Sequence, residues 1–202
     1  MITIIDYKVG NLGSIENMLK KIGAKSEITS DPKKIKLSTK IILPGVGAYD
    51  SGVESLKKNN LWDILNEKAL TEQVPILGIC LGAQLLCRKS EEGKLDGFGW
   101  INAEVRRFDF KDKVLKVPHI GWNYTSLQKK SKLFKGMYED PKFYFVHSFY
   151  MDVNDNSGLT KTNYSFEFDS AVEKENIIGV QFHPEKSHKF GMKLLENFAQ
   201  EY

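Results

Sequence analysis

The chain has 202 residues, of which 41% are hydrophobic and 27% are charged, as in an ordinary soluble globular protein. Its 29 basic and 26 acidic residues are well mixed and leave a formal net charge of +3. This balance gives no support to binding of nucleic acid or of a membrane surface, and no apolar run is long enough to span a bilayer. We expect one α/β domain that covers residues 1–202.

The N-terminus and the cysteines favour a cytoplasmic protein. The chain opens with a strand-like segment rather than with the basic start and apolar centre of a signal peptide. The two cysteines, Cys80 and Cys87, are too few for a disulfide framework. On one helix they would lie about 10 Å apart, which is too far for a disulfide. Reduced thiols are therefore expected.

Strands and helices alternate through the first half of the chain. Strands are predicted at residues 1–5, 26–29, 40–43 and 75–79. Helical spacing of apolar side chains predicts a helix that begins at Leu12 and ends near Gly23. A further helical stretch follows through Val53 and Leu56 and, after Asn59-Asn60, through Trp62, Leu65 and Leu70. Such alternation with short turns predicts a parallel sheet covered by helices on both faces.

The second half of the chain is richer in extended segments. These are predicted at residues 102–108, 113–117, 143–147, 171–173 and 177–182. The last two segments form a hairpin across Lys174, Glu175 and Asn176. The chain closes on a helix with a shared apolar face made of Phe190, Leu194, Leu195 and Phe198. We therefore expect an antiparallel part added to the parallel sheet.

The segment Gly78-Ile79-Cys80-Leu81-Gly82 predicts a strand that turns sharply at Cys80 into a helix. A side chain at such an elbow is held exposed in a strained conformation, and the following amide points at the group that it attacks. A helix N-terminus also favours the thiolate form of a cysteine. The alternative is that Cys80 is a small buried hydrophobe between two core elements.

His183-Pro184-Glu185 follows directly on the apolar strand predicted at residues 177–182. This places the motif at the edge of an open α/β sheet where ligands bind. Proline forces an extended turn, so the side chains of His183 and Glu185 can converge. A nucleophilic cysteine needs a base and a third group that orients the base, and Cys80, His183 and Glu185 supply all three. The alternative is a surface turn with a charged pair.

Two other candidates are weaker. Gly45, Val46 and Gly47 follow a strand as a phosphate-binding loop does, but with two of the three Rossmann glycines they fit a simple strand-to-helix turn as well. The four histidines lack the spacing of a metal site. No metal and no cofactor are expected.

The two motifs resemble those of the class I (triad) glutamine amidotransferases. Further segments are similar to the glutaminase subunits of imidazole glycerol phosphate synthase, from histidine biosynthesis: Asp6-Tyr7, Gly10-Asn11-Leu12, Leu43-Pro44-Gly45-Val46-Gly47, Ser90-Glu91-Glu92-Gly93 and, most specifically, Lys116-Val117-Pro118-His119-Ile120-Gly121-Trp122-Asn123. The resemblance covers essentially the whole chain. It implies a flavodoxin-like three-layer fold with a mostly parallel central sheet and an added antiparallel part.

The resemblance also implies roles for individual residues. Cys80 attacks the side-chain amide of L-glutamine and forms a γ-glutamyl thioester, His183 is the base, and Glu185 orients it. The remaining implied groups are an oxyanion hole of Gly45, Val46, Gly47 and Leu81, a substrate-binding set of Gln84, Glu92, His147, Ser148 and Phe149, and a partner interface of Asn11, Trp122 and Lys186.

The implied partner is a synthase (cyclase) subunit, a (β/α)8 barrel that forms a heterodimer with this chain over Cys80. One glutaminase domain takes up the 202 residues, and free ammonia in neutral water is mostly ammonium, so the ammonia has to be passed on directly. Peptide planes between Gly45 and Gly47 can turn over at little steric cost. We therefore expect a nearly inactive subunit that its loaded partner switches on.

Two departures from the family pattern leave the acceptor of the ammonia open. Ala83 stands where methionine is usual, and Gly99-Trp100-Ile101-Asn102-Ala103 replaces a glycine-leucine-proline-glycine passage. Paralogues of this subunit serve surface-sugar amidation instead. Two other classes are a stand-alone cysteine hydrolase of the same fold and a non-catalytic flavodoxin-like binding module.

Overall fold

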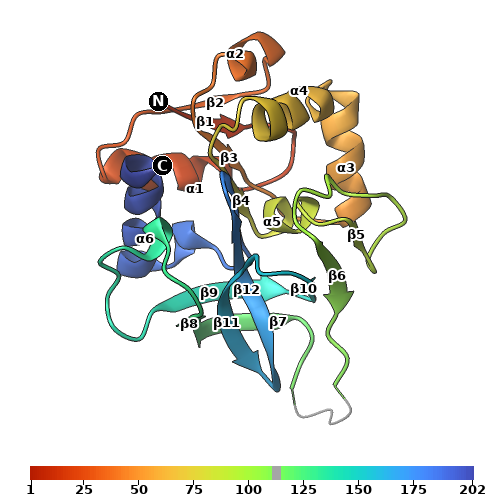
Figure 1. Cartoon of the computed structure of the whole chain (residues 1–202), viewed down its shortest axis with the longest axis vertical. Helices are drawn as coiled ribbons and strands as arrows, with labels where there is room; N and C mark the ends of the chain where they lie inside the picture. Colours follow the sequence, from red (N-terminus) through yellow and green to blue (C-terminus); the bar gives the residue numbers. More distant parts are fainter. Residues whose placement is uncertain (111–114) are drawn as a thin grey trace.

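The computed structural model describes residues 1–110 and 115–202, and strands from both halves of the chain join one large sheet (Figure 1). The strands of this sheet are β1 (Ile2–Ile5), β2 (Ser26–Thr29), β3 (Ile41–Leu43), β4 (Ile76–Ile79), β5 (Lys89–Ser90), β6 (Ala103–Arg107), β8 (Ser126–Leu127), β10 (Phe149–Val153), β11 (Gly158–Tyr164), β12 (Phe166–Lys174) and β13 (Ile177–Val180). Their order is β2-β1-β3-β4-β13-β12-β10-β6-β5, with β11 beside β12 and β8 beside β11. A smaller antiparallel sheet pairs β7 (His119–Tyr124) with β9 (Lys142–His147).

The centre of the large sheet is parallel, as predicted. Strand β1 pairs with β2 and β3, and β4 pairs with β3 and β13, all in parallel register. Strands β1, β3, β4 and β13 are almost continuously apolar, as is typical of parallel strands with both faces buried. In parallel pairing the strands end at one edge of the sheet. The residues that follow β3, β4 and β13 therefore meet there.

The antiparallel part begins at β12, which pairs with β13 across the predicted hairpin turn. Strands β10 and β11, which lie next to β12, were not predicted from the sequence. The extended run predicted at residues 113–117 is wrong where the structure describes it, since residues 115–117 form no strand. Residues 113 and 114 lie outside the described residues. The strand of this region is β7, which begins after Pro118.

The helices are α1 (Leu12–Lys21), α2 (Pro32–Lys36), α3 (Tyr49–Lys58), α4 (Trp62–Asn66), α5 (Leu81–Leu85) and α6 (His188–Glu201), with a π-helical turn η1 (Glu67–Thr71) and 3-10 turns η2 (Lys132–Phe134) and η3 (Pro184–Lys186). The long helical stretch predicted after Gly47 is interrupted at Asn60, whose φ of 57° ends the first helix. Helix α2 was not predicted, although Asp31 caps it through the Lys33 amide and Pro32 occupies its first turn.

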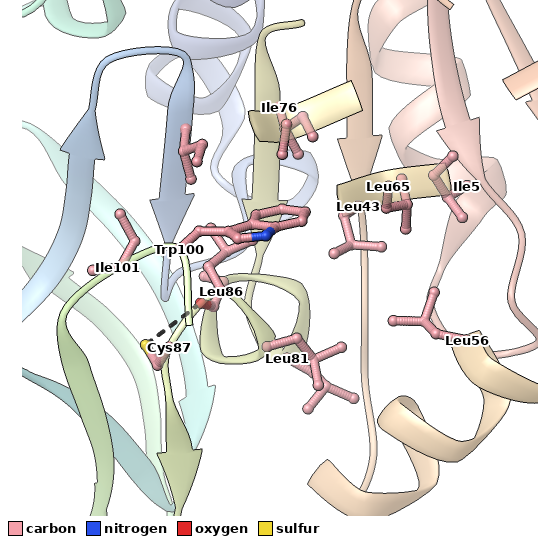
Figure 2. Close-up of a cluster of buried hydrophobic side chains, with 14 of the residues drawn as sticks. Ile5, Leu43, Leu56, Leu65, Ile76, Leu81, Leu86, Cys87, Trp100 and Ile101 are labelled. Atoms are coloured by element: carbon pink, nitrogen blue, oxygen red, sulfur yellow. Dashed lines mark hydrogen bonds between the residues drawn. The ribbon is translucent and has the colours of Figure 1, made fainter. Parts of the chain in front are cut away.

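Helices cover both faces of the central sheet. Helices α1 and α6 lie on one side and α3 and α4 on the other (Figure 1). Neighbouring strand residues accordingly enter different cores, with Ile4 packed toward α1 and α6 and Ile5 packed toward α3 and α4. Figure 2 shows the second of these cores, where Leu43, Ile76 and Leu81 belong to the same buried cluster. This confirms the three-layer α/β fold.

At the two departures from the family pattern, Ala83 and Trp100 lie in the core. Ala83 is fully buried, and a side chain on Gly179 would come within 3.1 Å of its β-carbon. Trp100 is buried with its indole N–H donating to Asn66 Oδ1 at 2.8 Å. Both positions therefore pack the interior. In the part of the chain described, no helix is both long and apolar enough to cross a membrane.

Candidate active site

Cys80 occupies the predicted turn between β4 and α5. Its φ of 54° and ψ of −110° are strained for a residue with a side chain. The Cys80 amide donates to Val180 O at 2.8 Å, and its carbonyl accepts from Ala83 and Gln84 at 3.0 and 3.1 Å. A β-carbon on Gly82 would lie 1.8 Å from the Leu43 carbonyl oxygen, so glycine is required for α5 to start this close to β3. The backbone on both sides holds the elbow in place.

His183 and Glu185 form a buried pair beyond the end of β13. His183 Nδ1 lies 2.7 Å from Glu185 Oε1, and the two side chains are only 2% and 1% exposed. Ser187 fixes the turn, because its hydroxyl donates to the His183 carbonyl at 2.6 Å and accepts from the Tyr144 amide at 3.0 Å. The carboxylate can only accept from the imidazole, so Glu185 sets the position of one ring proton.

The charge state of His183 follows from its neighbours. Burial by itself lowers the pKa of His183, but the interactions with Cys80 and Glu185 outweigh it and raise this pKa to about 10. His183 is then an imidazolium at neutral pH. Among the described residues, its Nε2 has no hydrogen-bond partner, which leaves a donor available toward the cavity.

Cys80 and His183 face one cavity of about 370 Å³. Its lining includes ten of the site residues expected from the sequence: Val46, Gly47, Cys80, Leu81, Gln84, Glu92, His147, Ser148, Phe149 and His183. Gly45 and Glu185 are not among the lining residues, and Pro118 and Val146 complete the lining. Hollows of about 590 to 700 Å³ lie elsewhere on the molecule, but none of the described residues that line them is a cysteine or a histidine.

The turn after β3 has a packed end and an open end. The Tyr7 hydroxyl is buried and donates to the Pro44 carbonyl, and a β-carbon on Gly45 would lie 2.9 Å from the Gly82 nitrogen. Gly47 has a φ of +107° with open space around it, and Val46 is 42% exposed. The Val46–Gly47 peptide therefore lies beside the cavity where glycine permits it to turn over.

Glu92 lies at the cavity, and its Oε2 accepts from the Tyr49 amide at 2.9 Å at the start of α3. Its other oxygen is available for a cation, such as the α-ammonium group of an amino acid. In the part of the chain that is described, no group of three or more histidines, cysteines, aspartates and glutamates is placed to hold a metal ion.

The wall of the cavity at His147 is held by a chain of hydrogen bonds. His147 Nδ1 lies 2.7 Å from the Phe149 carbonyl, which can only accept, so this nitrogen carries the proton. His147 Nε2 then accepts from His119 Nδ1 at 3.0 Å, and His119 Nε2 accepts from Asn123 at 3.3 Å. Burial lowers the pKa of His119 to about 4 and that of His147 to about 3, so both rings are neutral. Both nitrogens of His147 are occupied within the protein.

Sequence reasoning missed Gln181. It is fully buried, and its Nε2 lies 3.8 Å from Cys80 Sγ. Its Oε1 accepts from Gln84 Nε2 at 3.0 Å, and the same Gln84 nitrogen donates to the Phe149 carbonyl at 3.2 Å. The sequence signal that could have indicated Gln181 is its spacing from His183. Residues two apart along an extended chain share a side, and Gln181 lies two residues before His183.

An exposed aromatic surface lies on strand β7, which begins directly after Pro118 of the cavity lining. Trp122 is 38% exposed and stacks on His188 at 5.3 Å, and it meets Tyr144 edge-on at 6.1 Å. Lys186 is exposed, with Nζ 5.7 Å from the centroid of the Tyr144 ring. Asn11 is exposed and follows Gly10, which packs against Pro44 of the turn after β3. Trp122 and Lys186, expected at a partner interface, thus share one surface.

The sequence profile of the family described as "Glutamine amidotransferase class-I" matches residues 3–202. The chain therefore belongs to the class I glutamine amidotransferases, as the motifs at Cys80 and His183 indicated.

Individual relatives match the chain over its whole length. It is 55% identical over 202 residues to the imidazole glycerol phosphate synthase subunit HisH 2 of Methanococcus maripaludis, which covers 100% of both chains. It is 47% identical over 201 residues to the subunit of the same name in Pseudomonas aeruginosa, with 99% of each covered. Among solved structures, a glutamine amidotransferase aligns with a TM-score of 0.74 at 15% identity, over 98% of this chain and 97% of that one. PurLQS from Thermotoga maritima aligns with a TM-score of 0.71 at 18% identity, over 98% and 96%. These two structures confirm the fold.

Proposed function

We propose that the chain, acting as one domain over residues 1–202, is the glutaminase subunit of an imidazole glycerol phosphate synthase in histidine biosynthesis. It hydrolyses L-glutamine to glutamate and ammonia and passes the ammonia to a synthase partner. The observation that carries the proposal is the cavity shared by a strained Cys80 and by a histidine whose second nitrogen is held by a buried carboxylate. The relatives named HisH support the pathway.

The chemistry proceeds in two steps, formation of a thioester and its hydrolysis. The Cys80 thiolate attacks the side-chain amide carbon of glutamine, a C–S bond forms, and the carbonyl oxygen becomes an oxyanion. When this intermediate collapses, the C–N bond breaks and His183 gives its proton to the departing nitrogen, which leaves as ammonia. Water then attacks the thioester carbon and gives one proton to His183. The C–S bond breaks, the thiolate is restored, and the new carboxyl group releases the other proton to solvent, so that glutamate leaves. Glu185 holds the imidazole in position throughout.

The oxyanion is held by the Leu81 amide and by a backbone amide of the turn from Gly45 to Gly47. A first-turn amide of a helix has no acceptor within the helix, so the Leu81 N–H is available. The open end of the turn at Gly47 supports a switch, since one orientation of the peptide presents an N–H and the other a carbonyl oxygen. Loss of one such donor costs about 100- to 1,000-fold in rate.

Glutamine binding uses the remaining lining of the cavity. Glu92 pairs with the α-ammonium group, and backbone and side-chain groups of Ser148 and Phe149 line the opposite wall. His147 and the nitrogen of Gln84 act from behind, because their hydrogen bonds are already made within the protein. Neither departure from the family pattern lies in the cavity lining, so both are compatible with this substrate.

The partner is a synthase (cyclase) subunit, a (β/α)8 barrel that forms a heterodimer and docks over the cavity at the surface around Trp122, Lys186 and Asn11. Exposed aromatic side chains are the residues that dominate binding energy at interfaces. We place the reaction in the cytoplasm, where a catalytic thiol stays reduced.

The test is the glutaminase rate of the chain alone, with its partner, and with partner plus acceptor substrate. The expected result is a low basal rate that rises by at least about 100-fold when both are present. Three rates that agree within a factor of a few would overturn the switch, and complete amidotransfer by the single chain would overturn the partner. A loaded sugar-amidating synthase in place of the cyclase tests the other acceptor class.

Trp122→Ala isolates the docking surface. We expect it to weaken partner binding about 30-fold or more, because truncating a central aromatic residue costs roughly 2 kcal/mol. Alkylation of Cys80 in the chain alone should not change. Binding as tight as in the unsubstituted chain would place the interface elsewhere.

A further inference from the structure

The Cys80 sulfur has a second polar neighbour besides His183. Gln181 follows β13 directly and is fully buried, and its backbone amide donates to Ser170 O at 2.9 Å. Its side-chain nitrogen lies 3.8 Å from Cys80 Sγ. A buried primary amide has to place both its N–H groups and its oxygen, so the direction in which it points is informative.

One carbonyl group fixes that direction. The Phe149 carbonyl can only accept, and Gln84 Nε2 lies 3.2 Å from it, so the Gln84 amide cannot be turned over. The Gln84 nitrogen also lies 3.0 Å from one end of the Gln181 amide, and that end must be the oxygen. The Gln181 nitrogen is consequently the end that faces the sulfur.

The Phe149 carbonyl is contacted by a second donor, His147. His147 Nδ1 donates to the same Phe149 carbonyl at 2.7 Å, and His147 is held in turn by His119 and Asn123. The bonds between His119 and His147 and between Gln84 and Gln181 are buried, those to the Phe149 carbonyl and from Asn123 are partly buried, and all of them agree with one set of donors and acceptors. The side-chain nitrogen of Gln181 is the donor at the end of this network, and it faces Cys80 Sγ.

We propose that Gln181 is a further functional residue, whose amide donates to the Cys80 thiolate and holds it in the position for attack while Gln84 holds the Gln181 amide in that orientation. An amide does not give up its proton at neutral pH, so Gln181 can hold the sulfur without protonating it. His183, two residues on, carries the proton. A hydrogen bond to a charged acceptor is stronger than one to a neutral acceptor, so the contact favours the thiolate.

The proposal rests on the proposed function in taking Cys80 as the nucleophile. It is tested on the full chain by the rate of Cys80 alkylation with iodoacetamide as a function of pH, located by mass spectrometry. Among the described residues, the other titratable groups around the sulfur are His183 with its partner Glu185, Tyr7, and the cavity residues His147 and Glu92, and they are unchanged in the variants. Gln181→Met keeps the volume and removes the donor. We expect the midpoint of the curve of alkylation rate against pH to lie about one pH unit higher than in the unsubstituted chain. Below that midpoint, alkylation should be about tenfold slower.

Two further variants make the test specific. Asn197→Leu is the matched control, since it removes another buried amide that donates to two carbonyls, on α6, and it should keep the unsubstituted midpoint. Gln84→Met leaves Gln181 in place but frees its amide to turn over, and it should raise the midpoint by a smaller amount. If circular dichroism shows that Gln181→Met does not fold, Gln84→Met carries the test.

If Gln181→Met and Gln84→Met fold and their pH midpoint of alkylation is unchanged, the proposal is overturned. An equal shift of this midpoint in Asn197→Leu would also overturn it. Glutaminase activity of Cys80→Ala, measured with the partner, separates this from the proposed function. If Cys80→Ala remains active, the proposed function fails. If it is inactive and Gln181→Met alkylates as the unsubstituted chain does, then the role of Gln181 alone is wrong.

Discussion

The two cysteines lie seven residues apart in sequence on either side of α5, and although both are buried, they differ in backbone conformation, in access to the cavity and in polar neighbours. Cys80 sits at a strained elbow, faces the cavity and has His183 and Gln181 beside it. Cys87 is completely buried, with its sulfur 3.8 Å from the Ala83 carbonyl, and it packs near Trp100 and Ile101 (Figure 2). Burial raises the pKa of the Cys87 thiol. Backbone position, rather than residue type, distinguishes the two.

Replacing each cysteine tests this comparison with the largest expected effect. Cys80→Ala should lower partner-activated glutamine hydrolysis about 10⁴- to 10⁶-fold, because the covalent step is lost. Cys87→Ala should keep most of the rate, although the cavity it leaves will lower the melting temperature. Steady-state rates in the complex decide the matter, and comparable losses from both variants would contradict the assignment.

His183→Asn should be nearly as damaging as Cys80→Ala, since the two residues act as a unit. The double variant should then be no slower than Cys80→Ala alone, because effects within such a unit are not additive. The same steady-state assay applies. Independent, multiplicative losses would show that His183 acts somewhere other than on Cys80.

Gly47→Ala should lower the partner-activated rate about 10²-fold, because a side chain at a φ of +107° is strained and the turn can no longer present its donor. Gly13→Ala on α1 is the matched control, since a β-carbon there meets nothing within 4 Å. Rates of both variants with partner and acceptor are the measurement. Equal rates in the two variants would show that the turn from Gly45 to Gly47 does not act as a switch.

The smallest effect is on the pH dependence of stability. The pKa values of His119 and His147 are lowered to about 4 and 3, so the unfolded chain binds more protons below pH 6.5 and stability falls as the pH falls. The pKa of His183 is raised to about 10, so its contribution is complete below pH 6.5 and is lost as the pH rises toward 10.

These three histidines together predict a maximum of the free energy of unfolding near pH 6.5, with slopes of up to about 1.4 kcal/mol per pH unit for each group. Urea unfolding at pH 5, 6.5 and 8 measures it. A combined His119→Asn, His147→Asn variant should lose the decline on the acid side. An unchanged acid slope in that variant would mean that other groups cause it.

Much of this fold was predictable because its central strands obey local rules. The runs at β3 and β4 carry no polar side chain and that at β1 is interrupted only by Thr3, and β2 and the hairpin of β12 and β13 were found by pattern. Strands β10 and β11 were missed because their side chains do not alternate cleanly, and their pairing with β12 comes from distant parts of the chain.

The site residues likewise divide into those that local motifs predict and those that depend on contacts between distant parts of the chain. Cys80, His183 and Glu185 were found because each lies in a short motif at a strand end. Gln181 and the ring orientations of His119 and His147 were not found, because they depend on hydrogen bonds across 97 and 28 residues. No spacing in the sequence gives such a contact.

The most direct test of the central claim is covalent labelling of the full chain, in complex with its partner, by a glutamine-like electrophile. Mass spectrometry of the digested protein then locates the adduct. We predict one adduct, on Cys80, formed rapidly and suppressed by glutamine, with Cys87 unmodified. Equal labelling of the two cysteines, or labelling of Cys87 alone, would contradict the claim that the elbow makes the nucleophile.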